Sequence, residues 1–362
     1  MDVGSMVDID SVVTEYRASR GTFESLTFRV TTLIKDLLAR EKIDVIQVES
    51  RTKDVESFRD RLSRKGDRYT DPLREITDLS AVRIITYYQK DVDTIGTLIE
   101  KEFEIDTDNS INKGAELDPD RFGYMSVHYV ASISDSRGQL PEWLTFQSMK
   151  VEIQVRTALQ HAWAAVNHKL DYKSADEAPA ELRRKLFRLS ALFELADEQL
   201  SDIREARSQI TQEYVSEVQE GNFDMPLNRT SLRAYLITHP YMKEILSFTK
   251  SDLGRNVVGL SDPHPSRSRD LTDLLATLRH CDIDSISAFD TLMRRLMNRA
   301  ADIKSIFAGS SDLTPEDSPT LENFLTYWIL LDADIDKKFF VSVYGDDAWD
   351  DFAQDVRTYR QP

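Results

Sequence analysis

The sequence contains a single cysteine, Cys281, which excludes an internal disulfide and a zinc site built from cysteine thiolates. A P-loop, a G-x-S-x-G elbow, an H-E-x-x-H helix and a G-x-G-x-x-G turn are also missing, so the motifs of four common kinds of site are absent. The N-terminus has no basic stretch before an apolar core, and the apolar stretch 324–335 acquires charge too soon to cross a bilayer. We therefore expect a cytoplasmic protein that makes no contact with a membrane.

The chain also has fewer basic than acidic residues. The chain has 63 Asp and Glu against 46 Lys and Arg, for a formal net charge of −17. Broad, non-specific binding of nucleic acids needs a basic field, so this class of function is disfavoured. Residues 1–175 have 24 basic against 30 acidic residues, and the remainder has 22 against 33. A site for anions is therefore expected as a local cluster in the N-terminal half.

Hydrophobic periodicity divides the chain into a mixed part and a helical part. Apolar residues at three- and four-residue spacing predict helices at 8–42, about 53–65, 91–103, from 158 onward and from 182 to about 215. Runs rich in β-branched and aromatic residues predict strands at 80–88, 124–133 and 148–157, and 109–123 is expected to be a loop. This order predicts an α/β or α+β domain over 1–220 and a mainly helical domain over 221–362.

Polar residues, most of them basic, repeat along the second predicted helix. The residues that recur every fourth position are Lys53, Ser57, Arg61 and Lys65, and Arg51 lies just before them. On one helix face, such a strip would suit a polyphosphate, because Arg and Lys pair with phosphate oxygens. Acidic residues are interleaved, however, and the pattern alone favours a solvated face with ion pairs.

Two shorter segments hold further candidates. Asp78 precedes a predicted strand that carries Arg83, and a carboxylate there could bind Mg²⁺ or simply cap a turn. In the next strand, Tyr124, Ser126 and His128 share one face. The Tyr124 ring could stack on a nucleobase, or the strand could be an ordinary amphipathic one.

The segment "EIQVRT" alternates polar and apolar side chains. As a strand, it would direct Glu152, Gln154 and Arg156 to one face and two β-branched side chains to the core. A helix follows, and its predicted buried stripe is Leu159, Trp163, Val166 and Leu170. Two histidines, His161 and His168, lie on another face of this helix. No further ligand is suitably spaced for zinc, so a zinc site is not expected.

In this order, the segments "SRTKDVESFRDR", "DLSAVRI", "GYMSVHYV" and "EIQVRTALQHAWAAVNHKLDYK" resemble the synthetase domain of the RelA/SpoT family. The resemblance spans roughly 45–175. It implies an α+β fold, with a mixed β-sheet flanked by helices, ahead of the helical C-terminal region. It also implies a reaction in which the β,γ-pyrophosphate of ATP passes to the 3′-hydroxyl of GDP or GTP and AMP leaves.

The resemblance further implies a role for each matching residue. ATP would be held by Arg51, Lys53, Ser57, Arg61 and Arg83. Mg²⁺ would be bound by Asp78 and Glu152. Glu152 would also act as the base toward the attacking hydroxyl, although a role in metal binding alone stays open. The acceptor nucleotide would contact Tyr124, through stacking on its base, and His128, Gln154, Arg156 and His168.

The chain departs from the family pattern in places, and alternatives follow. Ala81 stands where the family usually has Gly, and Asn167 stands where many relatives have Glu. The family's hydrolase motif does not precede the synthetase segment, so we expect synthesis without hydrolysis. One alternative is a toxin that acts on the tRNA 3′ end or makes an adenosine alarmone, restrained by an antitoxin-like domain at 221–362. Another is a catalytically silent nucleotide sensor, and a homo-oligomer is compatible with each.

Overall fold

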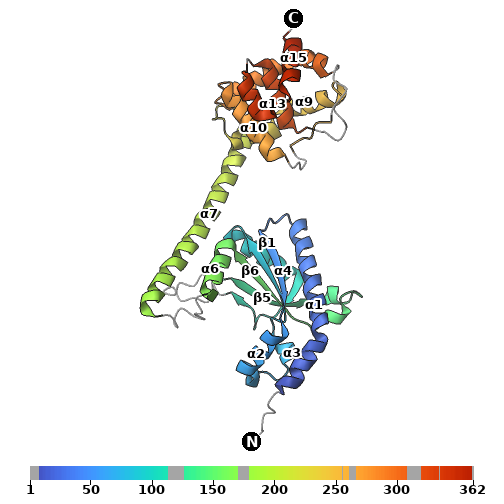
Figure 1. Ribbon diagram of the computed structural model, residues 1–362, viewed down its shortest axis with the longest axis vertical. Helices are drawn as coiled ribbons and strands as arrows, with labels where there is room; N and C mark the ends of the chain where they lie inside the picture. Colours follow the sequence, from blue (N-terminus) through green and yellow to red (C-terminus); the bar gives the residue numbers. More distant parts are fainter. Residues whose placement is uncertain are drawn as a thin grey trace. The chain divides into compact units, whose positions relative to one another are not determined.

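The computed structural model describes residues 8–112, 126–169, 179–254, 256–260, 266–307, 319–333 and 335–360. The chain divides into two compact units, Met1–Arg204 and Glu205–Pro362 (Figure 1). The sequence placed the domain boundary at 220, and that functional division stays a prediction. Among the described residues, no helix combines the length and the apolar character that crossing a membrane would require.

The first unit is built on a mixed β-sheet. Its strands are β1 (Gln47–Thr52), β2 (Ser80–Thr86), β3 (Phe103–Ile105), β4 (Ile111–Asn112), β5 (Val127–Ile133) and β6 (Val151–Thr157). The order across the sheet is β1-β2-β6-β5-β3, and β4 pairs with β5. Strands β2 and β6 are parallel, whereas the other pairs are antiparallel. The α+β fold with a mixed sheet is therefore confirmed.

Helices cover the apolar face of this sheet. The helices of the first unit are α1 (Ile9–Arg40), α2 (Val55–Lys65), α3 (Pro72–Glu75), α4 (Gln89–Glu102), α5 (Asp135–Gly138), α6 (Ala158–Lys169) and the start of α7 (Ala180–Glu220). Apolar residues of α1 and α4 form one core with β2, β5 and β6 (Figure 1). In α4, Gly96 lies against the Tyr129 ring, and a Cβ atom at residue 96 would come within 2.2 Å of the tyrosine oxygen. The opposite sheet face is thus left for polar side chains.

The predicted elements recur with shifted ends. Strand β5 is described from Val127 and β6 begins at Val151, each three residues later than the sequence indicated. Strand β1 was not predicted. Its residues alternate irregularly between exposed and half-buried positions, as expected for an edge strand, so it gives no clear apolar period.

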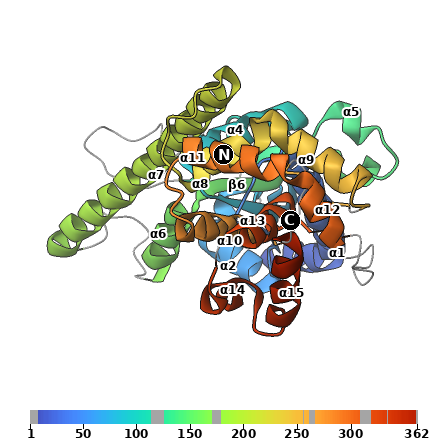
Figure 2. The ribbon, with the colours of Figure 1, turned by 90° about the horizontal axis from the view of Figure 1, so that it is seen from above.

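The second unit is helical, as predicted. Its helices are α8 (Arg229–Thr238), α9 (Pro240–Ser251), α10 (Arg267–His280), α11 (Ile286–Asn298), α12 (Ala300–Phe307), α13 (Leu321–Asp332), α14 (Lys337–Tyr344) and α15 (Trp349–Tyr359). Helix α13 is buried almost all round, with Trp328 fully enclosed, and it packs against α10, α11 and α15 (Figure 2). The core of this unit therefore forms around α13.

Within the first unit, α7 contacts the end of the central strand β6. The Thr157 hydroxyl donates to a carboxylate oxygen of Asp197 at 2.6 Å, and both residues are buried. Farther along α7, Arg204 donates to Asp91 at 2.6 Å. Burial raises the pKa of Asp197 from 3.8 to about 7.

This shift predicts a dependence of stability on pH. Because the folded state binds the proton of Asp197 more tightly than the unfolded state, the contribution is fully present below about pH 4 and is lost as pH rises through about 7. We expect the free energy of unfolding of the wild type to fall relative to that of Asp197→Asn by on the order of 2 kcal/mol between about pH 5 and pH 9. Urea unfolding of both proteins across this range measures the difference, and parallel pH profiles would contradict it.

Candidate active site

The polar residues of β6 form a hydrogen-bonded row. Gln154 Nε2 donates to Glu152 Oε2 at 3.0 Å, and Arg156 Nη2 donates to Gln154 Oε1 at 2.6 Å. Between them, Ile153 and Val155 are 0 % exposed and belong to the core. The alternation that the sequence predicted is thus present, and the three polar side chains meet on the face opposite the core.

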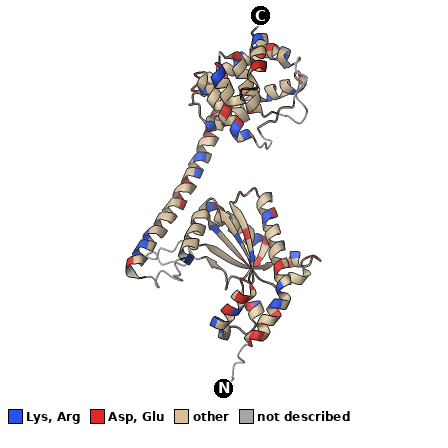
Figure 3. Ribbon diagram, in the orientation of Figure 1, with Lys and Arg blue, Asp and Glu red and all other residues tan. Residues whose placement is uncertain are grey.

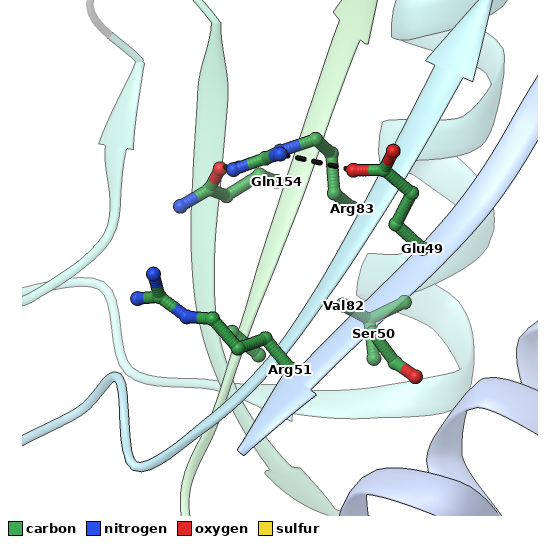
Figure 4. Close-up of a pocket in the computed structure, with 7 residues that line it drawn as sticks. Glu49, Ser50, Arg51, Val82, Arg83 and Gln154 are labelled. Atoms are coloured by element: carbon green, nitrogen blue, oxygen red, sulfur yellow. Dashed lines mark hydrogen bonds and ion pairs between the residues drawn. The ribbon is translucent and has the colours of Figure 1, made fainter. Parts of the chain in front are cut away.

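The row continues across the neighbouring strands. Arg83 of β2 is in register with Gln154, and Glu49 of β1 is in register with Arg83. Arg83 donates to Gln154 Oε1 at 3.3 Å and to Glu49 Oε2 at 2.9 Å (Figure 4). This part of the sheet forms the floor of a cavity of about 500 Å³, lined by Glu49, Ser50, Arg51, Ala81, Val82, Arg83 and Gln154.

On the other side of β6, His128 of β5 extends the row. Its Nδ1 lies 2.9 Å from Glu152 Oε1, and its Nε2 lies 2.7 Å from Ser126 Oγ. Burial disfavours the ionised form of Glu152, but the hydrogen bonds from His128 and Gln154 and the charge of Lys53 outweigh it and lower the pKa of this carboxyl. Glu152 is therefore held ionised in a largely buried position.

A second cluster lies around Asp78. Lys53 Nζ contacts Asp78 Oδ2 at 2.5 Å, and Arg61 Nη1 contacts Asp78 Oδ1 at 2.8 Å. The Lys53 side chain is only 8 % exposed. Its carbonyl accepts a hydrogen bond from the Tyr16 hydroxyl at 2.6 Å, which joins the cluster to α1. Two cations thus converge on one carboxylate at the junction of β1, α2 and β2.

This geometry corrects the helical strip that the sequence predicted. Lys53 lies before the helix, because Asp54 is the N-cap of α2 and accepts from the Ser57 backbone and hydroxyl, both at 2.8 Å. Lys53 and Arg61 meet at Asp78, whereas Ser57 turns to Asp54 and Lys65 is exposed. Ser57, Arg61 and Lys65 therefore keep their four-residue spacing within α2, whereas Lys53 lies outside the helix and meets Arg61 only at Asp78.

The two clusters share an electrostatic field. The charge of Lys53 contributes to the lowered pKa of Glu152. Burial lowers the pKa of Arg61, but the hydrogen bond with Tyr69 and the charges of Asp78 and Glu152 outweigh it, and the pKa is raised. Lys53 and Arg61, which contact Asp78, thus also interact through their charge with Glu152.

Asp78 and Glu152 are the candidate ligands of a magnesium ion. Within the described ranges, no three His, Cys, Asp or Glu side chains form a group that could hold a metal ion. Magnesium is usually bound by one or two carboxylates with waters and substrate phosphates, rather than by a full protein cage. Asp78 and Glu152 fit that requirement by their chemistry, because each offers hard oxygen donors: Asp78 pairs with Lys53, and the charge of Lys53 also acts on Glu152.

Two residues near the site were not assigned from the sequence. Glu49 was not assigned because β1 was not predicted. The sequence shows it only as a charged residue two positions before Arg51. His161 lies in the first turns of α6 and is close enough to Arg156 and Arg83 to be affected by their charges. Burial and then the charges of Arg156 and Arg83 lower its pKa. Burial and the charge of Arg83 also lower the pKa of Arg156, to about 10.

The structure describes the side chains of only some of the residues predicted to bind the acceptor. His128, Gln154 and Arg156 lie together on β5 and β6. Tyr124 lies outside the described residues, and for His168 only the backbone position within α6 is described. The roles of all these residues stay predictions.

A mixed sheet with a row of cations and two carboxylates on one open face defines a domain suited to polyphosphate chemistry. Residues 50–177 match the family described as "Region found in RelA / SpoT proteins". Over these residues the chain is therefore similar to the RelA/SpoT family that its sequence motifs resemble.

Two curated relatives align with this part of the chain. The GTP pyrophosphokinase YwaC of Bacillus subtilis is 28% identical over 162 residues, which are 43% of this chain and 72% of the relative. The GTP pyrophosphokinase YjbM of the same organism is 28% identical over 165 residues, or 43% and 71% of the two chains.

Solved structures are also similar. Small alarmone synthetase 1 from Bacillus subtilis has a TM-score of 0.44 and 21% identity, covering 54% of this chain and 98% of that chain. A GTP pyrophosphokinase family protein from Streptococcus pneumoniae has a TM-score of 0.44 and 19% identity, covering 53% and 94% of the two chains.

Proposed function

We propose that the protein is a pyrophosphotransferase that moves the β,γ-pyrophosphate of ATP to the 3′-hydroxyl of GDP or GTP. The observation that carries the proposal is the convergence of Lys53 and Arg61 on Asp78, within the electrostatic field of an ionised Glu152. The RelA/SpoT region and the relatives named GTP pyrophosphokinase support the same reaction.

The ATP phosphates would bind at the cationic end of the cavity. Arg51 lines the cavity beside Arg83, and Lys53 and Arg61 lie at the end of β1 and on α2. Transfer of a phosphoryl-type group depends mainly on positioning and on spreading charge over the developing anion. Asp78 and Glu152 would hold Mg²⁺, which supplies further positive charge to the phosphates when bound.

The acceptor would lie on the β5 side of Glu152, where His128 and Gln154 hold this carboxylate in place. We assign Glu152 as the base that takes the proton of the 3′-hydroxyl. The acceptor oxygen forms a bond to the β-phosphorus of ATP, and the bond between that phosphorus and the α,β-bridging oxygen breaks. AMP leaves with the electron pair, so atoms and charge balance.

The test is to supply ATP labelled in its β- and γ-phosphates, with Mg²⁺ and one acceptor at a time, and to follow the label. The acceptors are GDP, GTP, ATP and a bulk tRNA preparation. We expect label on guanosine nucleotides, together with an equal amount of AMP. Label on none of the guanosine nucleotides contradicts the proposal.

The same assay separates the alternatives. Label only on tRNA, or only on an adenine nucleotide, would replace the proposed acceptor, and the absence of any transfer with nucleotide binding retained would favour a silent sensor. Basic and acidic residues are interspersed along the elements of both units (Figure 3), which gives tRNA less support than a nucleotide. An antitoxin-like role of 221–362, a homo-oligomer and a cytoplasmic location stay proposals.

A further inference from the structure

The junction between β6 and α6 is closed by a reciprocal cap. Thr157 is the last residue of β6, and its hydroxyl accepts from the Gln160 backbone N–H at 3.1 Å. In return, the Gln160 side-chain oxygen accepts from the Thr157 backbone N–H at 2.9 Å. This is a capping box, which satisfies two backbone donors and sets the direction in which a helix starts. The cap therefore fixes the first turn of α6 against the end of the central strand.

Helix α7 supplies a further partner of this cap. A threonine hydroxyl has one proton to donate. Thr157 gives it to Asp197 at 2.6 Å, and Asp197 is only 3 % exposed. The Thr157 hydroxyl therefore accepts from Gln160 and donates to Asp197 at the same time. The position of Asp197 on α7 thus favours one rotamer of the Thr157 side chain.

The residues on either side of the cap point to a ligand. Arg156, directly before Thr157, is buried, and its Nε has no hydrogen-bond partner within the described part of the chain. His161, just beyond Gln160, likewise has a buried Nδ1 without a hydrogen-bond partner there. Unpaired buried polar atoms are costly. Two of them beside one junction indicate that a bound polar group completes their hydrogen bonds.

Further contacts hold α7 beside this junction. Arg204 lies 4.6 Å above the Tyr88 ring and donates to Asp91 at 2.6 Å, near the start of α4. Trp163 of α6 and Phe193 of α7 have ring centroids 6.0 Å apart. The Thr157–Asp197 hydrogen bond is thus one of several contacts between α7 and the elements around the site.

We propose that Asp197 is a positioning residue for the acceptor end of the site. By accepting the Thr157 hydroxyl, it fixes the capped start of α6 and so the directions of Arg156 before the cap and His161 after it. Asp197 does not touch the substrate in this scheme. The inference rests on the proposed function, because the acceptor is the ligand that these two side chains would meet.

The test compares Asp197→Ala and Thr157→Val with the wild type. We expect both variants to raise the KM for GDP about tenfold, with the KM for ATP changed less than about twofold, because small displacements of positioning groups have large effects. We also expect backbone amides of 158–163 to exchange hydrogen at least about tenfold faster. Asp197→Asn and Thr157→Ser keep an acceptor and a hydroxyl, and they should stay near the wild type in both measurements.

Asp202→Ala is the matched control, because Asp202 is an exposed acidic residue of the same helix. An equal rise in both KM values, or unchanged hydrogen exchange in Asp197→Ala and Thr157→Val, overturns the inference.

If Asp197→Ala does not fold, the comparison of Thr157→Val with Thr157→Ser decides. If the wild type transfers no label, the proposed function fails, and calorimetric GDP binding by wild type and variants still tests positioning. No GDP binding by the wild type overturns both.

Discussion

Replacing Glu152 by Gln is expected to reduce the rate of pyrophosphate transfer by on the order of 10³-fold. The amide cannot take the proton of the acceptor hydroxyl, and it removes one of the two negative charges that face Lys53 and Arg61. Folding should survive, because an amide can still accept from Gln154 and donate to a neutral His128. Single-turnover rates at saturating ATP and GDP measure the loss, and calorimetric titration should show that both nucleotides still bind.

Glu49→Gln is the matched control for this prediction. Glu49 is also a carboxylate of the polar row, and it pairs with Arg83 at 2.9 Å, two strands away from Glu152. Its loss should raise the KM for ATP by less than about tenfold, because an ion pair that is partly exposed contributes little. A Glu152→Gln variant within about tenfold of the wild type would show that this carboxylate is neither the base nor a required ligand.

Asp78→Asn is expected to have the second largest effect, and to alter both activity and stability. The rate should fall at least about 100-fold, and the Mg²⁺ concentration for half-maximal rate should rise, because an amide is a poor ligand for magnesium. Lys53, only 8 % exposed, would lose its ionic partner, so we expect the free energy of unfolding to fall by about 3 kcal/mol. Magnesium titrations of activity and urea unfolding measure the two effects.

The exposed Asp71 provides a control in the same segment, and Asp71→Asn should change neither quantity. A double variant, Lys53→Met with Asp78→Leu, should recover most of the stability without activity, because the buried Lys53–Asp78 pair is then apolar and Arg61, which is 32% exposed, keeps its hydrogen bond with Tyr69. An Asp78→Asn protein with an unchanged Mg²⁺ requirement would remove Asp78 from the predicted metal site.

Local sequence patterns predicted what depends on local structure. The alternation in β6 identified Ile153 and Val155 as core residues and the intervening polar side chains as a separate face. Edge strand β1 gave no such pattern, so the sequence did not indicate that Glu49 would pair with Arg83. That pairing depends on the register between two strands, which a short polar edge strand does not reveal.

The site itself could be predicted only as a set of residues. The family resemblance assigned Lys53, Arg61 and Asp78 to one site. The eight-residue spacing of Lys53 and Arg61, however, predicted that both lie on one face of a helix. The N-cap at Asp54 prevents that arrangement, because it starts the helix after Lys53. Their meeting at Asp78 depends on the close packing of β1, α2 and the turn before β2, and no periodic signal reports such tertiary contacts.

The parallel pairing of β2 with β6 has a consequence for the order of folding. Arg83 and Gln154, which touch across this pair, are 71 positions apart in the chain. The cluster at Asp78 can form as soon as β1 and β2 have been synthesised, whereas Glu152 joins it only when a much longer loop closes, at a cost that grows slowly with loop length. A growing chain on the ribosome would therefore gain the cations proposed to bind phosphate first and the proposed base last, and under the proposed function it could catalyse no transfer until β6 had entered the sheet.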